Sequence, residues 1–535
     1  MSILGQFFQS LFFRSFPFTI HCLQQHRITF QHGTYITVPA GTRLDNAIVQ
    51  AGYALRTPCG GAGTCGKCLV NVLQQNVLAC QTIVESDLDV TVPDTSLRSD
   101  EQNVVVQTVS EFAVSRLPSA VSQGYGIALD IGTTTLAAEL HDFSGTLPMQ
   151  IVFRANPQRI FGDDVMTRIQ KIMEDETALT AMQRLIVKAI NEMIAELTGG
   201  MGIAPYDVSM LIASGNTVMQ SIFFGIDPSP LGASPFRSPV NDFPVCPASE
   251  IGLTLSGTVG TFPIFGGFVG GDIVAGMLAV QDCSPKSRGR SAAQSPGAPS
   301  FLLDIGTNGE IVLSHSGKHY TAATAAGPAF EGAKITCGTL AVPGAVDHVD
   351  FIDGKVVVST IGHQPAVGIC GSGLIDAAAV LLERGVIEPS GRFADKASHF
   401  ELVSSSESGL GEAIVLTQRD IRELQLAAGA IRAGIMLLLQ EHRVLPEDIE
   451  TFYLAGGFGQ FIRTDSAKRI GLFPSSIPSE RFQFCGNTSL AGARAMLLNP
   501  DNARVVRRLV EQSQHCELAT LPQFQEVFAE SMCWL

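Results

Sequence analysis

No apolar run in the 535-residue sequence is long and unbroken enough to cross a membrane. Residues 1–25 contain six phenylalanines, but Gln and Ser interrupt them and no small-residue cleavage site follows. We expect this stretch to be an unassigned lead, with a weak signal peptide or a membrane-surface helix as the alternatives. The prediction for the whole chain is that it has no membrane partner.

The sequence also lacks an excess of basic residues. It has 35 Lys and Arg against 50 Asp and Glu, so its formal charge is −15 at pH 7. This balance argues against a nucleic acid as the partner. Nor do the 12 Cys form the framework of a small secreted protein, because the chain is long and four of them are bunched between residues 59 and 80. A reducing compartment, the cytoplasm, is therefore expected.

Glycine and apolar residues are abundant. With 53 Gly, 27 Pro and 45% hydrophobic residues, the composition is that of an α/β protein with many tight turns. The length allows several domains, each with its own core.

One tetrapeptide, Asp-Ile-Gly-Thr, occurs twice, at Asp130–Thr133 and at Asp304–Thr307. Each copy follows a short apolar run, which predicts a buried strand, a tight turn and a second strand. The glycine would let backbone approach an anion, and the hydroxyls and N–H groups of the turn would bind phosphate. The carboxylate would face a Mg²⁺ through water or position an attacking water. Two ordinary hairpins are the alternative, but the repetition favours two related half-domains that face each other across a cleft.

A glycine-rich cysteine loop is the most specific local motif. It consists of Cys59-Gly-Gly-Ala-Gly-Thr-Cys65-Gly-Lys-Cys68 and is followed, after eleven residues, by Cys80. Three thiolates in such a loop and a fourth from a later strand are the ligand plan of a ferredoxin-type [2Fe–2S] cluster. A zinc site would need a second Cys-x-x-Cys pair, and a [4Fe–4S] ferredoxin would show tighter spacing. Buried structural thiols would have no reason to share a glycine loop.

The residues around the cysteines have the pattern of a β-grasp domain. Alternating apolar residues predict a hairpin that turns at Gln31-His32-Gly33, and the next apolar residues recur at helical spacing from Leu44 to Ala51. A second hairpin, turning at Gln74-Gln75-Asn76, would return Cys80 to the loop. We therefore expect residues 26–94 to form one domain and residues 95–124 to be a linker.

Capping residues and apolar spacing predict helices in the remainder of the chain. The expected helices cover Val165–Met173, a segment that stops at Gly199-Gly200, Gly371–Leu382, and a segment that begins at Thr417 with Asp420 as capping partner.

Two further segments have simpler interpretations. Asp272 follows a Gly-rich turn and is a third candidate cleft carboxylate, although an ordinary turn explains it when it is taken alone. Residues 284–299 are low in complexity and predict a flexible loop between the two halves.

A strand at Phe452–Ala455 ends in Gly456-Gly457, where a flat base and a ribose could lie against backbone. Two phosphate turns followed by strand-Gly-Gly resemble the motif order of the nucleotide-binding fold shared by actin, sugar kinases and heat-shock chaperones. With the cysteine loop in front, the chain resembles the reductive activators of corrinoid proteins over roughly residues 27–500. The resemblance also rests on these motifs: Asn156-Pro-Gln, Asp304-Ile-Gly-Thr-Asn-Gly-Glu310, Ala326-Gly-Pro-Ala-Phe-Glu-Gly332, Thr417-Gln-Arg-Asp420 and Ala455-Gly-Gly-Phe-Gly459.

The resemblance implies an α/β multidomain protein, in which a β-grasp [2Fe–2S] ferredoxin-like domain precedes a duplicated actin-like ATPase fold. The two ATPase halves would cover residues 125–283 and 300–500, with 501–535 as a C-terminal extension. The implied activity is ATP-hydrolysing electron transfer from the cluster to the Co(II) form of a corrinoid protein, which restores Co(I). The family implies a low-potential electron donor, and a homodimer is one assembly that it allows.

The resemblance also assigns residues to the cofactors, which would be a [2Fe–2S] cluster, ATP and Mg²⁺. Cys59, Cys65, Cys68 and Cys80 would hold the cluster, and Asp130 and Asp304 would be the catalytic carboxylates. The expected nucleotide-binding residues are Gly132, Thr133, Thr134, Gly306, Thr307, Asn308, Gly456 and Gly457.

Two other functions stay open. An ATP-gated iron–sulfur protein could deliver electrons to a non-corrinoid metalloenzyme, because fold analogy alone cannot name the acceptor. A kinase of the same fold with a vestigial cluster ranks last, because the four cysteines are arranged as in a working site.

Overall fold

The computed structural model describes residues 25–97, 124–145, 150–282, 298–457 and 461–534. The chain divides into two units: Met1–Arg56 with Gly66–Arg98, and Thr57–Cys65 with Ser99–Leu535. The predicted lead and nearly all of the predicted linker and of the loop 284–299 lie outside the described residues. The domain boundaries expected from the sequence stay predictions.

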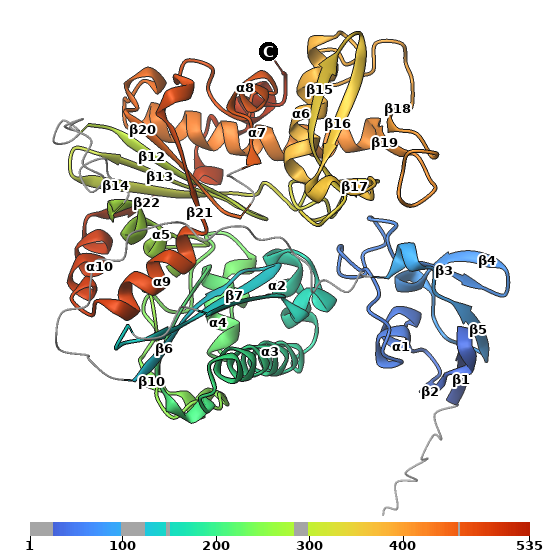
Figure 1. Ribbon diagram of the computed structural model, residues 1–535, viewed down its shortest axis with the longest axis horizontal. Helices are drawn as coiled ribbons and strands as arrows, with labels where there is room; N and C mark the ends of the chain where they lie inside the picture. The colour runs from blue at the N-terminus through green and yellow to red at the C-terminus, as the bar shows by residue number, and fades with distance from the viewer. Residues whose placement is uncertain (1–24, 98–123, 146–149, 283–297, 458–460, 535) are drawn as a thin grey trace, which may run out of the picture. The chain divides into compact units, whose positions relative to one another are not determined.

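The first unit is built on a five-stranded sheet in the order β2-β1-β5-β3-β4, with β1 parallel to β5. Ile28 and Phe30 alternate into its core, where they pack with Leu44 and Ile48 of the helix α1. The strands and the helix are labelled in Figure 1. This is the β-grasp arrangement expected from the sequence. Its elements are β1 Gln25–Phe30, β2 Tyr35–Pro39, α1 Leu44–Gln50, β3 Leu69–Val72, β4 Gln75–Leu78 and β5 Leu88–Thr91.

The hairpin of β3 and β4 turns earlier than the sequence predicted. Leu73 and Gln74 form a two-residue turn, with φ angles of 49° and 66°. Two central residues with positive φ match the twist of the flanking strands. The Gln74 N–H donates to Asn71 Oδ1 at 3.0 Å, which is a typical length for such a bond. Gln75 and Asn76, expected in the turn, therefore belong to β4.

Two six-stranded sheets form the frame of the second unit. The first has the order β10-β11-β9-β6-β7-β8 and the second the order β21-β20-β12-β13-β14-β22. The strands of the first are β6 Tyr125–Ile131, β7 Thr135–Asp142, β8 Gln150–Ala155, β9 Val208–Gly215, β10 Cys246–Pro247 and β11 Thr258–Thr261. Those of the second are β12 Ser300–Ile305, β13 Gly309–His315, β14 Lys318–Thr324, β20 Thr451–Ala455, β21 Phe482–Gly486 and β22 Ser513–His515.

The two sheets share a topology over five strands. In each, the strand before the Asp-Ile-Gly-Thr turn begins an antiparallel series of three, β6-β7-β8 or β12-β13-β14. In each, this strand also has a parallel neighbour on its other side, β9 or β20, followed by a parallel outer strand. The shared order fits the expectation of two related halves, whose common origin stays a prediction.

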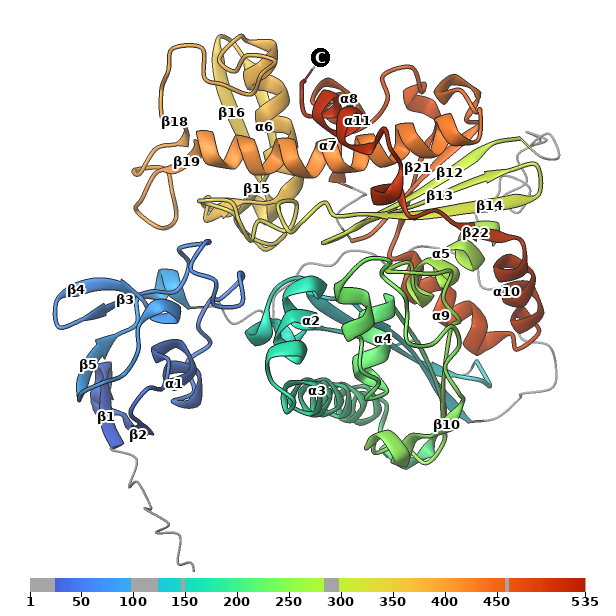
Figure 2. The same cartoon turned by 180° about the vertical axis from the view of Figure 1, so that it is seen from behind.

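Helices cover both faces of each sheet. The paired helices α5 Gly271–Asp282 and α9 Thr488–Leu498 pack on the first sheet, and α5 also packs on the second. The opposite faces are covered by α3 Ala178–Met201 and by α7 Gln418–Glu441, against which α11 packs (Figure 2). The other helices are α2 Val165–Glu174, α4 Thr217–Phe223, α6 Gly371–Glu383, α8 Thr464–Arg469, α10 Asn502–Glu511 and α11 Phe524–Ser531.

Strand alternation directs both repeated carboxylates to the same side. In β6, Ala128 packs with α5 and α9 while its neighbours pack with α3. In β12, Leu302 packs with α5 while its neighbours pack with α7. Side chains two residues apart in a strand share a face. Asp130 therefore points to the same face as Ala128, and Asp304 to the same face as Leu302. The two carboxylates therefore point toward the space that the two sheets share.

The helix predictions are confirmed except at one end. Helix α7 begins after Thr417, whose side chain and that of Asp420 form the expected capping box. Helix α3 continues through Gly199 and Gly200, where a stop was predicted, and ends at Gly202 with φ 68°. Buried Leu197 and Thr198 hold that last turn on the sheet, so packing outweighs the cost of two helical glycines. The predicted end was wrong because only Gly202 takes the left-handed conformation that terminates a helix.

Two small sheets lie beside the second large one, and α6 packs on the first of them. Their strands are β15 Ala345–Ile352, β16 Lys355–Thr360 and β17 Gly368–Ile369, and β18 His399–Val403 with β19 Ile414–Thr417. No helix in the described ranges combines the length and apolarity needed to cross a bilayer.

Candidate functional site

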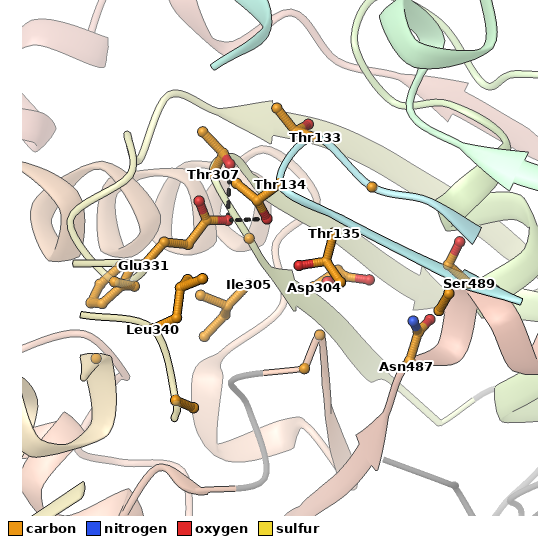
Figure 3. Close-up of a pocket in the computed structure, with 18 of the residues that line it drawn as sticks. Thr133, Thr134, Thr135, Asp304, Ile305, Thr307, Glu331, Leu340, Asn487 and Ser489 are labelled. Carbon is orange, nitrogen blue, oxygen red and sulfur yellow. Dashed lines mark hydrogen bonds between the residues drawn. The ribbon is translucent and has the colours of Figure 1, made fainter. Parts of the chain in front are cut away.

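Both Asp-Ile-Gly-Thr turns border one pocket of about 240 Å³ in the second unit (Figure 3). Every residue expected in the nucleotide site lines it. These residues are Asp130, Gly132, Thr133, Thr134, Asp304, Gly306, Thr307, Asn308, Gly456 and Gly457. The structure therefore brings together three segments that are far apart in the sequence.

Asp130, at the end of β6, has both carboxylate oxygens engaged by protein donors. The Asn487 side-chain amide donates to Oδ2 at 2.8 Å, and the Ser489 hydroxyl donates to Oδ1 at 2.7 Å. Asn487 also caps α9, because its Oδ1 accepts from the Leu490 N–H at 2.8 Å. Burial raises the pKa of Asp130, and the bonds from Ser489 and Asn487 oppose that shift. Asp130 thus fastens the start of α9 to the first sheet.

Side chains from other elements hold the first turn by its backbone. Asn156 donates to the Gly132 carbonyl at 2.8 Å, and buried Arg168 of α2 donates to the Thr133 carbonyl. The Thr133 hydroxyl accepts from Asn216, at the start of α4, at 3.1 Å. These contacts give Asn156 of the Asn-Pro-Gln motif a structural role, which is to fix the turn.

The carboxylate of Asp304, at the end of β12, has no hydrogen bond or ion pair with any other residue that the structure describes. Burial and the charge of Asp130 raise its pKa to about 7. Gly456 lies so close that a Cβ there would come within 2.4 Å of the Ile305 carbonyl oxygen. Its φ of 93° also favours glycine. The glycine after β20 thus allows that loop to approach the second turn.

Two further carboxylates join Asp304. Burial and repulsion from Asp304 raise the pKa of Asp272 well above its usual value, and burial and repulsion from Asp272 do the same for Glu310. The mutual repulsion of these hard oxygen donors suits a divalent cation. Among the described residues no three Asp, Glu, His or Cys side chains form a group that could hold a metal ion. With so few protein ligands, a Mg²⁺ bound here would keep part of its water shell and rely on phosphate oxygens.

Glu331 connects the two turns. Its Oε1 accepts from the Thr307 hydroxyl at 2.9 Å and from the Thr134 hydroxyl at 3.5 Å (Figure 3). Because Thr134 belongs to the first turn and Thr307 to the second, one carboxylate oxygen links both copies of the repeat. The sequence prediction did not include Glu331 among the site residues.

The four cysteines are divided between the two units. Cys59 and Cys65 belong to the segment Thr57–Cys65, and Cys68 and Cys80 are buried in the first unit. Cys59 has strong thiolate character, because donation from Cys65 and from the backbone N–H groups of Cys65, Thr64 and Gly61 lowers its pKa to about 4. Amides directed at a sulfur are what an iron–sulfur site requires. The donor set therefore fits a cluster, and its assembly from all four thiolates stays a prediction.

Family models match most of the described chain. A 2Fe-2S iron-sulfur cluster binding domain matches residues 29–88, the RACo middle region residues 125–281, and the C-terminal ASKHA domain of RACo residues 298–534. A solved structure, "Reductive activator for corrinoid,iron-sulfur protein", matches with a TM-score of 0.69 and 29% identity, over 95% of this chain and 98% of that one. The chain is a homologue of the reductive activators of corrinoid proteins.

Two further relatives match most of this chain. The corrinoid activation enzyme RamQ of Eubacterium limosum is 29% identical over 92% of this chain and 96% of its own length. A reductase of the methylated amine-specific corrinoid protein from Methanosarcina barkeri is 28% identical over 76% of each chain. The ferredoxin-like domain and the actin-like ATPase fold expected from the sequence are thereby confirmed.

Several pocket residues of this activator homologue were not predicted, but the sequence has a signal for some of them. Gly-Asn-Thr occurs at residues 215–217 and again at 486–488, each time where a strand ends and the asparagine caps the next helix. Asn216 and Asn487 both line the pocket. Asp272, a third candidate cleft carboxylate in the sequence although an ordinary turn also explained it, lines the pocket too.

Proposed function

We propose that the protein is an ATP-hydrolysing redox activator that transfers one electron from a [2Fe–2S] cluster to the Co(II) form of a corrinoid protein, restoring Co(I). The observation that carries the proposal is the convergence of both phosphate turns on one acidic pocket, in a chain that also has a low-pKa cysteine loop. The electron acceptor is inferred from the names of two relatives, which both act on corrinoid proteins.

The cysteines have a defined role in this proposal. Cys59, Cys65, Cys68 and Cys80 hold the cluster, which accepts and donates one electron at a time. A thiolate with a pKa of about 4 at Cys59 is already deprotonated at neutral pH and can bind iron without first losing a proton.

In this proposal, different pocket residues bind different parts of Mg-ATP. The turns at 132–134 and 306–308 bind the phosphates through backbone N–H groups and hydroxyls. Asp304, with Asp272 and Glu310, would hold the Mg²⁺ that accompanies the nucleotide. Gly456 and Gly457 leave room for the adenosine. Asp130 acts mainly by holding α9, which is a narrower role than the catalytic one expected from the sequence.

Three finer points belong to the same proposal. A low-potential donor reduces the cluster again, because each turnover removes one electron from it. The protein acts in the cytoplasm, where thiols stay reduced. It works as a homodimer, for which sedimentation equilibrium of the cluster-loaded protein gives a direct test.

The deciding experiment is anaerobic. Dithionite-reduced protein is mixed with a Co(II) corrinoid protein from the same organism, and the visible spectrum is followed for Co(I) with and without Mg-ATP. Appearance of Co(I) only with Mg-ATP supports the proposal, and Cys65→Ser should abolish it while leaving ATP hydrolysis measurable. A normal cluster spectrum without Co(I) under any nucleotide condition would assign the protein to a non-corrinoid acceptor.

A further inference from the structure

Glu331 lies in the motif Ala326-Gly-Pro-Ala-Phe-Glu-Gly332, to which the proposed function gives no task. Its carboxylate is placed where the two phosphate turns meet. The Thr307 hydroxyl donates to Oε1 at 2.9 Å, and the Thr134 hydroxyl lies 3.5 Å from the same oxygen (Figure 3). A terminal phosphate held by both turns must therefore lie near this side chain.

The second carboxylate oxygen is the informative one. Oε2 of Glu331 is buried and has no hydrogen-bond partner in the described part of the chain. A buried acceptor without a donor is costly, and such a group is usually explained by a ligand, a water or a catalytic task. Because Glu331 lines the pocket, the donor missing at Oε2 can be a water that enters with the nucleotide.

We propose that Glu331 is the general base of ATP hydrolysis, an inference that rests on the ATPase activity in the proposed function. Its Oε1 is held by the two threonines, and Oε2 accepts a proton from the attacking water. The water oxygen forms a bond to the γ-phosphorus, and the bond from that phosphorus to the β,γ-bridging oxygen breaks. ADP keeps the bond's electron pair, inorganic phosphate leaves, and Glu331 returns its proton to solvent.

The other pocket carboxylates are less suited to this task. Both oxygens of Asp130 already accept hydrogen bonds, from Asn487 and Ser489. Asp304 raises the pKa of Asp272, and both raise that of Glu310, which is an arrangement of charges that a cation relieves. Glu331 alone among these carboxylates is hydrogen-bonded to a threonine from each turn.

The charges around Glu331 favour a base that works near neutral pH. Burial raises its pKa to about 7, while the Thr307 hydroxyl, Arg159 and Arg168 lower it and Asp163 raises it. A base is most effective when its pKa lies near the working pH. Arg159 and Arg168 come from the first half and Glu331 from the second, so its basicity depends on both halves.

The test compares Glu331→Gln with Glu331→Asp and with a control, Glu447→Gln, whose side chain is exposed on the surface of the second unit. ATP hydrolysis, equilibrium binding of Mg-ATP and the cluster spectrum are measured for each full-length, cluster-loaded protein. We expect kcat of Glu331→Gln to fall by about 100-fold or more, as for loss of a general base. Binding of Mg-ATP should change by less than about threefold, because Gln can still contact the threonines. Glu331→Asp should keep part of the activity.

The pH profile separates a base from a structural link. The wild-type kcat should decline as the pH falls below about 7, the pKa of Glu331. This acidic limb should disappear in Glu331→Gln, whose residual rate has no such base. An unchanged kcat in Glu331→Gln, or a loss of Mg-ATP binding with kcat retained, would overturn the inference. If instead the wild type hydrolyses no ATP, the proposed function fails before Glu331 is tested.

Discussion

The two copies of Asp-Ile-Gly-Thr begin with the same residue in very different surroundings. Asp130 accepts two hydrogen bonds from the start of α9, and the turn after it is fixed by Asn156, Arg168 and Asn216. Asp304 has no such partner among the described residues, and its pKa is raised to about 7. The difference shows that the carboxylate of the first copy is committed to holding the fold together, whereas the carboxylate of the second copy is available for a ligand.

The largest expected effect is on catalysis at the available carboxylate. Asp304→Asn should lower the rate of ATP hydrolysis by about 100-fold or more, because in the proposed function this charge would face the metal and the phosphates. The nucleotide-free variant should unfold at a higher temperature than the wild type, since a buried carboxylate repelled by Asp130 has been neutralised. Steady-state kinetics and thermal unfolding measure the two effects, and a hydrolysis rate within threefold of wild type would contradict this role.

The next effect is on stability at the committed carboxylate. Asp130→Ala should destabilise the second unit by about 1–3 kcal/mol, because half-buried Asn487 and buried Ser489 lose the acceptor of their side-chain donors. Asp304→Ala is the matched control and should cost less than Asp130→Ala, because it breaks no hydrogen bond. Urea unfolding of the anaerobic protein compares them, and equal losses in the two variants would remove the distinction between the copies.

A smaller effect is expected where the first turn is anchored. Asn156→Ala removes the bond to the Gly132 carbonyl and the bond from the Gln158 N–H, which together should cost about 1–2 kcal/mol. Since the first turn then loses a support, the KM for ATP should rise more than kcat falls. A variant with unchanged KM would mean that the turn keeps its shape without Asn156.

The last comparison concerns the dependence of stability on pH. The pKa of Asp304 is raised in the fold, from 3.8 to about 7. Between these values the folded protein binds more protons than the unfolded chain, so stability of the nucleotide-free protein should fall as the pH rises from about 4 to 7. Glu331 acts in the same direction. The slope measured by thermal unfolding should be shallower in Asp304→Asn, and an identical slope would argue that Asp304 titrates normally.

The sequence predicted the parts of this site that are local. A strand, a tight turn and the glycine in that turn lie within ten residues of each other, so both turns and the Gly456-Gly457 pair could be predicted to line one site. The hairpin turn was misplaced at Gln74-Gln75-Asn76 because Leu73 and Gln74 are not residues that usually take positive φ. The partners of Asp130 could not be predicted, because Asn487 and Ser489 are more than 350 residues away and only tertiary packing brings them there.

The position of α9 has a consequence for synthesis of the chain. This helix, at Thr488–Leu498, is a late segment, yet it packs on strands β6 and β9 of the first sheet and pairs with α5. A ribosome makes the first sheet long before it makes the segment that covers it. Apolar residues such as Ala128 and Val274 then lack their contacts with α9 until translation has nearly ended. We therefore expect this half to complete its folding only after α9 has been made, and a fragment that stops before residue 488 to aggregate more readily than the whole chain.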